Sequence, residues 1–363
     1  MRRIAGVDVA RGLAVLGMMT AHVGPDDADS RVLPGGFAQL ADGRPSALFV
    51  VLAGIGLALL SGGASPVVGT RLVQARLRVL VRAVLLFVLG ELLVMLGTPV
   101  AVILPTYAVL FAIGCLALRW SVRTLLVVAA AVAVVGPVLR AALEAGLAAW
   151  QPRPTLLAEI AVGHFYPAVV WLAYLCAGLA VGRCDLRSRR VRLVAAGVGA
   201  GLVVVGHVGA WVARDALGWP PSIATTEPHS SSTFEVLGNT GVALLVLVAC
   251  LVVAEAAPGL VSPVAAVGEL ALSAYTVHVV VIAVLGEGVV YAPAVASWLA
   301  FLVTTTVLCW SWRAALGRGP FERVLHGVST RAADVRPDML PDAPAPQEAG
   351  VGARPGSGEE HRP

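Results

Sequence analysis

Three ionisable side chains interrupt the first apolar stretch of the chain, and their types and spacing could support chemistry. Asp8 and Arg11 are three residues apart, so on a helix they share a face and can form an ion pair. His22 follows Arg11 by eleven residues, or about three helical turns, so its imidazole lies on the same face roughly 16 Å further along the axis. One helix face therefore carries a guanidinium that can bind phosphate or carbonyl oxygens and an imidazole that can act as a base.

Other histidines are expected at the same end of the molecule as His22. Following the direction of each predicted helix places five of the seven histidines there, namely His22, His164, His207, His229 and His278. We expect His278 to be the second reactive histidine because it lies deepest in its apolar stretch. His164 and His207 are candidate accessory groups, and Glu91 and Glu235 are acidic side chains available to orient an imidazole.

Each of these residues also has a purely structural interpretation. The Asp8–Arg11 pair can be a neutralised anchor near the membrane surface, and His22 a polar residue at the interface. His207 can hydrogen-bond a neighbouring helix, His164 can be an interfacial anchor, and His229, in the run PHSSST, can be a solvated loop residue.

The composition requires that these groups be held by membrane helices. Hydrophobic residues make up 58% of the 363 residues and charged residues only 13%, and the mean hydropathy is +0.85. A soluble domain has roughly a quarter of its residues charged. We expect an all-α, polytopic membrane bundle of about ten transmembrane helices. The predicted spans are residues 8–23, 46–61, 79–96, 99–118, 123–142, 163–182, 191–213, 236–254, 264–285 and 292–312, with Gly54 and Gly56 in the second favouring close helix packing.

The distribution of arginine predicts the orientation of these spans. With the N-terminus in the cytoplasm, 20 of the 26 basic residues, all of them arginines, fall in cytoplasmic segments and five in segments on the other side. Because the number of spans is even, the C-terminus is also cytoplasmic. The sequence therefore predicts a multi-pass protein of the plasma (inner) membrane. Arginines spread over short loops explain the basic pI without nucleic-acid binding.

The chain divides by composition into two parts. Residues 1–313 form the predicted membrane domain, and residues 314–363 a cytoplasmic tail, rich in Pro, Gly and charged residues, that is expected to be disordered beyond a short juxtamembrane helix. The longer outer loops, 24–45, 143–162 and 214–235, are candidates for lids or substrate contacts. No motif for a metal, for ATP or for a nucleophilic serine is present, so no permanently bound cofactor is expected.

The first helix resembles that of the membrane acyltransferases. The run from Asp8 to His22 is similar to the first helix of acyltransferase-3 proteins, in which an Arg, ten residues and a His form a signature, and of YeiB-like and heparan-α-glucosaminide N-acetyltransferase-like proteins. The segment GELALSAYTVH, ending at His278, is similar to a late helix of acyltransferase-3 proteins, although Thr276 stands where Leu is usual. Residues 163–183, GHFYPAVVWLAYLCAGLAVGR, look like a middle helix of the other two groups.

This resemblance implies an integral membrane acyltransferase. The enzyme would move an acetyl or similar short acyl group from cytoplasmic acyl-CoA, as co-substrate, to an outer-face acceptor such as a sugar or another envelope molecule. Arg11, with Asp8, would bind the CoA end, helped by the basic loops at 71–82 and 183–192. His22 would act as the general base or as a transient acyl carrier, and the sequence does not choose between these roles.

Two other functions are compatible with the same residues. A transporter or flippase of a small or lipid-linked solute could place Arg11 and His22 along a solute or proton path, although the two halves show no inverted repeat. A haem protein could use His207 and His278 as axial ligands. Solute uptake without acyl-CoA consumption would favour the first, and a Soret band the second.

Overall fold

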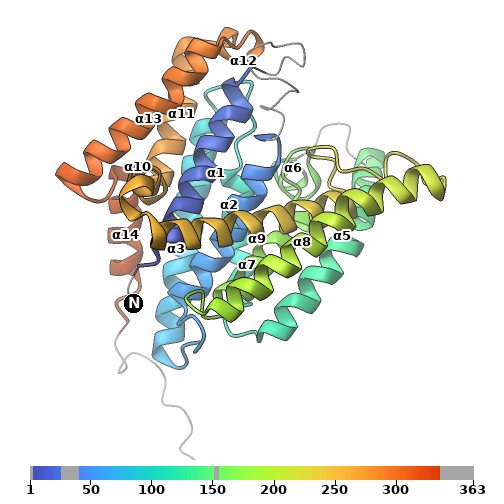
Figure 1. Ribbon diagram of the computed structural model, residues 1–363, viewed down its shortest axis with the longest axis horizontal. Helices are drawn as coiled ribbons and strands as arrows, with labels where there is room; N and C mark the ends of the chain where they lie inside the picture. Colours follow the sequence, from blue (N-terminus) through green and yellow to red (C-terminus); the bar gives the residue numbers. More distant parts are fainter. Residues whose placement is uncertain (1–2, 26–40, 151–154, 336–363) are drawn as a thin grey trace, which may run out of the picture.

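The computed structural model describes residues 3–25, 41–150 and 155–335, and this part of the chain contains helices and no strands (Figure 1). The helices are α1 (Ala5–Val23), α2 (Arg44–Leu60), α3 (Thr70–Val94), α4 (Leu104–Gly114), α5 (Val122–Trp150), α6 (Leu156–Val162), α7 (Ala168–Gly182), α8 (Arg189–Trp211), the π-helical turn η2 (Val212–Ala216), α9 (Thr233–Ala256), α10 (Pro258–Glu269), α11 (Ala271–Leu285), α12 (Gly288–Tyr291), α13 (Val295–Leu316) and α14 (Pro320–Ala332). The all-α class expected from the sequence is confirmed.

Helix α1 is the central element of the bundle. It contacts α2, α9, α10, α11 and α13, and Figure 1 shows it enclosed by these helices, with α5, α7 and α8 further out on one side. Buried residues therefore occur all around it, among them Ala10, Ala14, Val15 and Met19. A helix with buried residues on every face is typical of a protein's interior, and here it positions Arg11 and His22 inside the protein.

Glycines allow three helices to approach the backbones of their neighbours. A Cβ atom on Gly54 of α2 would lie 2.2 Å from the Leu175 carbonyl oxygen of α7, and one on Gly178 would lie 2.0 Å from the Val51 oxygen. A Cβ atom on Gly268 of α10 would lie 1.8 Å from the Asp8 oxygen of α1. The close packing expected at Gly54 is therefore present, whereas Gly56 faces open space.

Arg183 joins the ends of three helices at one end of the bundle. The side chain is buried and follows the last residue of α7. It donates to the Ala58 oxygen (3.2 Å), the Gly63 oxygen (2.8 Å), the Ser61 Oγ (2.9 Å) and the Leu118 oxygen. Carbonyl groups at helix C-termini carry partial negative charge, so they stabilise this cation without a carboxylate.

The membrane spans are the point at which the structure differs most from the sequence prediction. By length and composition, four described helices could cross a membrane, namely α5 as far as Ala149, α8 continued through Ala216, α9 and α13, or up to five if a bent pair counts as one span. Helices α2, α4 and α7 are apolar but shorter. The predicted span 99–118 is helical only over Leu104–Gly114, and part of the predicted loop 143–162 is helix in α5 and α6.

The predicted span 264–285 is wrong as a single helix. It is broken between α10 and α11, which are bent by 70°. The side chain of Glu322, from α14, accepts hydrogen bonds from the Leu272 and Ser273 N–H groups (2.8 and 3.0 Å) and from the Ser273 hydroxyl. These N–H groups lack intrahelical partners at a new helix start, so a residue some 50 positions away stabilises the break.

The short juxtamembrane helix expected after residue 313 is present as α14. It packs against α3, where Arg82 Nε donates to Ser329 Oγ (3.3 Å), and Gln74 Nε2 donates to the Val335 oxygen (3.1 Å). The segment predicted to be disordered, residues 336–363, lies outside the described residues, and the domain boundary at residue 313 stays a prediction.

Candidate functional site

The two histidines expected to be reactive lie in contact. The Nδ1 of His22, at the end of α1, is 2.9 Å from the Nε2 of His278 in α11, and the two rings are stacked with centroids 5.2 Å apart. His278 is buried, and His22 is half-buried. The residues are 256 positions apart in sequence, so the bundle, and not local spacing, creates the pair.

Tyr275 packs against the His278 ring of this pair. Its ring meets the His278 ring edge to face at 5.1 Å, and its hydroxyl accepts a hydrogen bond from the Ile103 N–H (3.3 Å), just before α4. The Nδ1 of His278 is buried and makes no hydrogen bond within the described part of the chain. The His278 ring is therefore held by packing against Tyr275 and by the contact of its Nε2 with His22.

Asp8 and Arg11 belong to an ion-pair network at the opposite end of α1. Arg11 Nη1 lies 3.0 Å from Asp8 Oδ1, and Arg3 Nε lies 3.2 Å from Asp8 Oδ2. Arg3 also pairs with Glu269 (2.6 Å), which in turn pairs with Arg313 (3.0 Å). The expected Asp8–Arg11 ion pair is present, and the network carries three cations against two anions.

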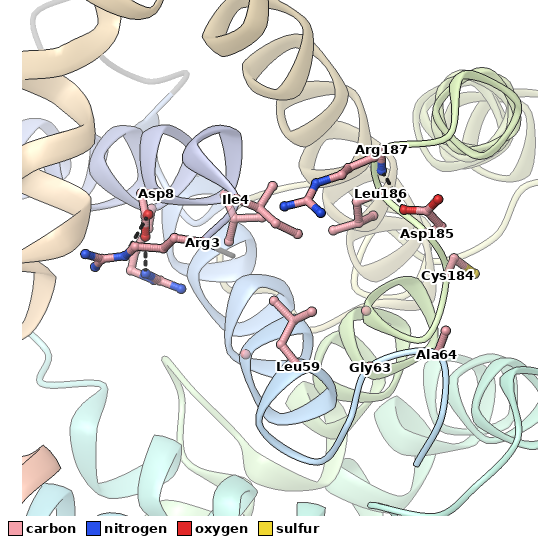
Figure 2. A pocket seen from close by; sticks show the side chains of 14 residues that line it. Arg3, Ile4, Asp8, Leu59, Gly63, Ala64, Cys184, Asp185, Leu186 and Arg187 are labelled. Atoms are coloured by element: carbon pink, nitrogen blue, oxygen red, sulfur yellow. Dashed lines mark hydrogen bonds and ion pairs between the residues drawn. The ribbon is translucent and has the colours of Figure 1, made fainter. Parts of the chain in front are cut away.

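Two cavities meet at Arg11 and Gly56. The first, of about 510 Å³, is bounded by Arg3 and Asp8 on one side and by the loop after α7, with Cys184, Asp185 and Arg187, on the other (Figure 2). The second, of about 280 Å³, extends from Arg11 between α2, α3 and α4 toward Phe49 and Tyr107, and Arg82 also lines it. Because Gly56 has no side chain, nothing from this position separates the two cavities.

The predicted accessory residues do not join the histidine pair. Glu91 lines a separate cavity of about 340 Å³ with Thr106 and Tyr166, and its buried Oε1 has no hydrogen-bond partner among the described residues. His207 Nδ1 lies 3.1 Å from the Val203 oxygen of its own helix, α8. His164 is exposed and its ring meets the Phe165 ring edge to face.

His229 makes contacts within the protein that the sequence did not predict. It is not simply solvated: its Nδ1 lies 3.0 Å from the Phe165 oxygen, and its ring packs edge to face against Phe165 and Tyr166. Burial lowers the pKa of His229, repulsion from His164 lowers it further, and the bond to the Phe165 oxygen opposes both. Glu235, expected to orient an imidazole, instead binds the loop that carries His229. The cluster SSST before an acidic residue was the available signal, since it is typical of a helix N-terminus.

Fold and site together define an all-helical membrane protein with a buried histidine pair at one end of its central helix and a cationic double cavity at the other. Comparison with known families identifies it further. Residues 3–212, more than half of the chain, match the family model described as heparan-α-glucosaminide N-acetyltransferase, catalytic, and the chain belongs to this family of membrane acetyltransferases. Residues 183–332 match a family described as a protein of unknown function (DUF418). No curated protein matches the chain.

Proposed function

We propose that the protein transfers an acetyl or similar short acyl group from cytoplasmic acyl-CoA to an outer-face acceptor, a glycan or another envelope molecule. The observation that carries this proposal is the His22–His278 contact, placed about eleven residues along α1 from Arg11. A single helix thus has an acid–base pair near one end and an anion-binding cation near the other, roughly 16 Å apart.

The double cavity supports binding of acyl-CoA at the Arg11 end. Its larger part, about 510 Å³, is within the size range of small-molecule sites, about 300–1,000 Å³. Arginines on both walls, Arg3 and Arg187, suit the phosphates of CoA, and the narrower part beside Phe49 and Tyr107 suits the less polar pantetheine arm. Arg11 stands where the two parts meet and can bind either.

The histidine pair supports proton transfer from the acceptor. For His22 Nε2 to act as a base, His22 Nδ1 must carry the hydrogen and donate it to His278 Nε2. His22 then takes the proton of the acceptor's hydroxyl or amine, the acceptor oxygen or nitrogen bonds to the acyl carbon, the carbon–sulfur bond breaks, and the CoA thiolate receives the proton. Transient acylation of His22 followed by transfer to the acceptor has the same overall balance.

The proposed topology brings both substrates to this site. We infer that ten segments cross the plasma membrane, namely α1 to α5, α7, α8, α9, the bent pair α10–α11, and α13, with both termini in the cytoplasm. Helix α4 alone is about 16 Å long, so irregular backbone on either side of it would complete its crossing. Buried residues in this backbone, Ile103 and Leu118, support that arrangement because non-helical chain within a membrane must be covered by protein.

A transporter is the less well supported hypothesis for the function of this site. Broken helices in transporters present free helix ends to the transported solute. In this protein the break lies between α10 and α11, and N–H groups at the start of α11 are already bound by Glu322. This end therefore offers no free site for an anionic solute.

The test is transfer of labelled acetyl from acetyl-CoA by purified protein in nanodiscs, with methyl α-glucosaminide as the first acceptor and an envelope extract as the second. His22→Ala should abolish labelling, and His278→Ala should reduce it by about 100-fold or more, because each removes acid–base assistance. His326→Ala, at an exposed position on α14, is the matched control. Unchanged labelling in His22→Ala would contradict the proposal, and uptake into proteoliposomes without CoA release would favour the transporter.

A further inference from the structure

The loop before α9 is held in a strained conformation by one buried carboxylate. Glu235 accepts hydrogen bonds from the His229 N–H (2.9 Å), the Ser230 hydroxyl (3.0 Å) and the Ser231 N–H (2.6 Å). His229 and Ser231 both have positive φ angles, 62° and 55°. Such angles are unfavourable for residues other than glycine. They persist where surrounding contacts enforce them, which is most often at functional sites.

The contacts of the His229 ring determine which nitrogen is available. The Phe165 carbonyl can only accept a hydrogen bond, so the His229 Nδ1 at 3.0 Å from it carries the hydrogen. The Nε2 therefore bears the lone pair, and no hydrogen bond to it is made by the part of the chain that the structure describes. Edge-to-face packing on Phe165 and Tyr166, at 5.2 and 5.6 Å, fixes the direction of the ring.

His229 also lies on the same side of the bundle as the histidine pair. Tyr166, against which its ring packs, lines the same cavity as Val102. The next residue, Ile103, donates its N–H to the Tyr275 hydroxyl (3.3 Å), and the Tyr275 ring contacts His278. A series of contacts through Tyr166 and Tyr275 thus links the loop that carries His229 to the His22–His278 pair.

We propose that His229 binds the acyl acceptor by accepting, at Nε2, a hydrogen bond from a second hydroxyl or amine of the acceptor, other than the reacting group that gives its proton to His22. Glu235 is then the positioning residue that holds His229 beside the His22–His278 pair. This proposal rests on the proposed function. It also implies that the acceptor site is composite, since His229 lies beyond residues 3–212, which match the acetyltransferase family, and within residues 183–332, which match the other family.

The experiment measures steady-state CoA release in nanodiscs while methyl α-glucosaminide and acetyl-CoA are varied separately. His229→Asn keeps the backbone N–H, and Asn tolerates positive φ well, so it removes the imidazole with little disturbance of the loop. Glu235→Gln replaces one acceptor oxygen by an N–H donor facing the loop. Glu227→Gln removes a carboxylate from the same loop at an exposed position and is the matched control.

We expect His229→Asn to raise the KM for the glucosaminide by about 5- to 20-fold, the loss of one hydrogen bond to substrate, with kcat and the KM for acetyl-CoA within about twofold of wild type. Glu235→Gln should raise the same KM, and Glu227→Gln should match wild type. Should Glu235→Gln fail to fold, His229→Asn decides. An unchanged glucosaminide KM in a folded His229→Asn variant overturns this inference alone. Absence of CoA release by the wild-type protein overturns the proposed function, and this inference with it.

Discussion

At the residue scale, the site depends on how each histidine's second nitrogen is used. The Nδ1 of His22 is turned toward His278, and the Nδ1 of His229 toward the Phe165 oxygen. The carbonyl partner of His229 fixes its tautomer and leaves Nε2 for a substrate, whereas His22 presents a basic Nε2 only when its Nδ1 carries the hydrogen and donates it to His278. His207 directs its Nδ1 to its own helix and has no such neighbour in the site. The chemistry of a histidine here is thus decided by its partner and not by its depth in the membrane.

Acidification should destabilise the loop that carries His229. Its pKa in the folded protein is lowered by burial, below the ordinary value of 6.5, so the unfolded protein binds more protons than the folded protein as the pH falls through about 6.5. Stability is therefore fully present above this pH and decreases below it. Groups near the ring are His164, His22 and the Glu235 carboxylate. Thermal unfolding between about pH 5 and pH 8 should show a smaller loss for His229→Asn than for wild type. Parallel curves would contradict this assignment.

At the scale of elements, small residues determine how closely the helices approach and where space is left. Helices α2 and α7 touch through Gly54 and Gly178. Helices α1 and α10 touch through Gly268, whose oxygen accepts a hydrogen bond from Arg11 Nη1 (3.4 Å). The sequence indicated close packing at both Gly54 and Gly56. Only Gly54 is closely packed, because two positions that are two residues apart point about 200° away from each other around a helix and so face different neighbours.

Substitution of these two glycines should separate packing from ligand access. Gly54→Ala should destabilise the protein by about 1–3 kcal/mol, because its Cβ would meet the Leu175 oxygen. Gly56→Leu meets no atom within 4 Å at Cβ, so it should leave the unfolding temperature unchanged while its side chain fills the junction of the two cavities. We expect its KM for acetyl-CoA to rise at least about tenfold. A stable Gly56→Leu protein with the wild-type KM would mean that acyl-CoA does not pass this junction.

At the scale of the whole molecule, the mechanism requires that the Arg11 end face the cytoplasm. The native cysteines allow a direct test. Cys184 lines the larger cavity and is partly exposed, whereas Cys115, Cys176, Cys250 and Cys309 are buried. Burial raises the pKa of the Cys184 thiol, so modification should be slow at neutral pH and faster in mildly alkaline buffer.

A membrane-impermeant maleimide should therefore label Cys184 in inside-out vesicles and not in right-side-out vesicles. Acetyl-CoA should slow the labelling, because the thiol lines the cavity proposed for CoA. Cys184→Ser identifies any signal from the buried cysteines. Labelling from the outer side would reverse the topology, and with it the direction of the proposed transfer.

The sequence by itself determined the helical class, the membrane environment, the acyltransferase resemblance, the Asp8–Arg11 pair and the spacing of Arg11 from His22. These follow from composition and from positions within one helix, where geometry is set by local periodicity. Only the tertiary structure decided that His22 meets His278, that Glu322 stabilises a break in the helix predicted over 264–285, and that Glu235 holds the His229 loop. The first two join residues roughly 50 to 256 positions apart, and in the third the loop's strained backbone is stabilised by a side chain of the following helix. Helical periodicity says which face a residue occupies but not which helix that face will meet.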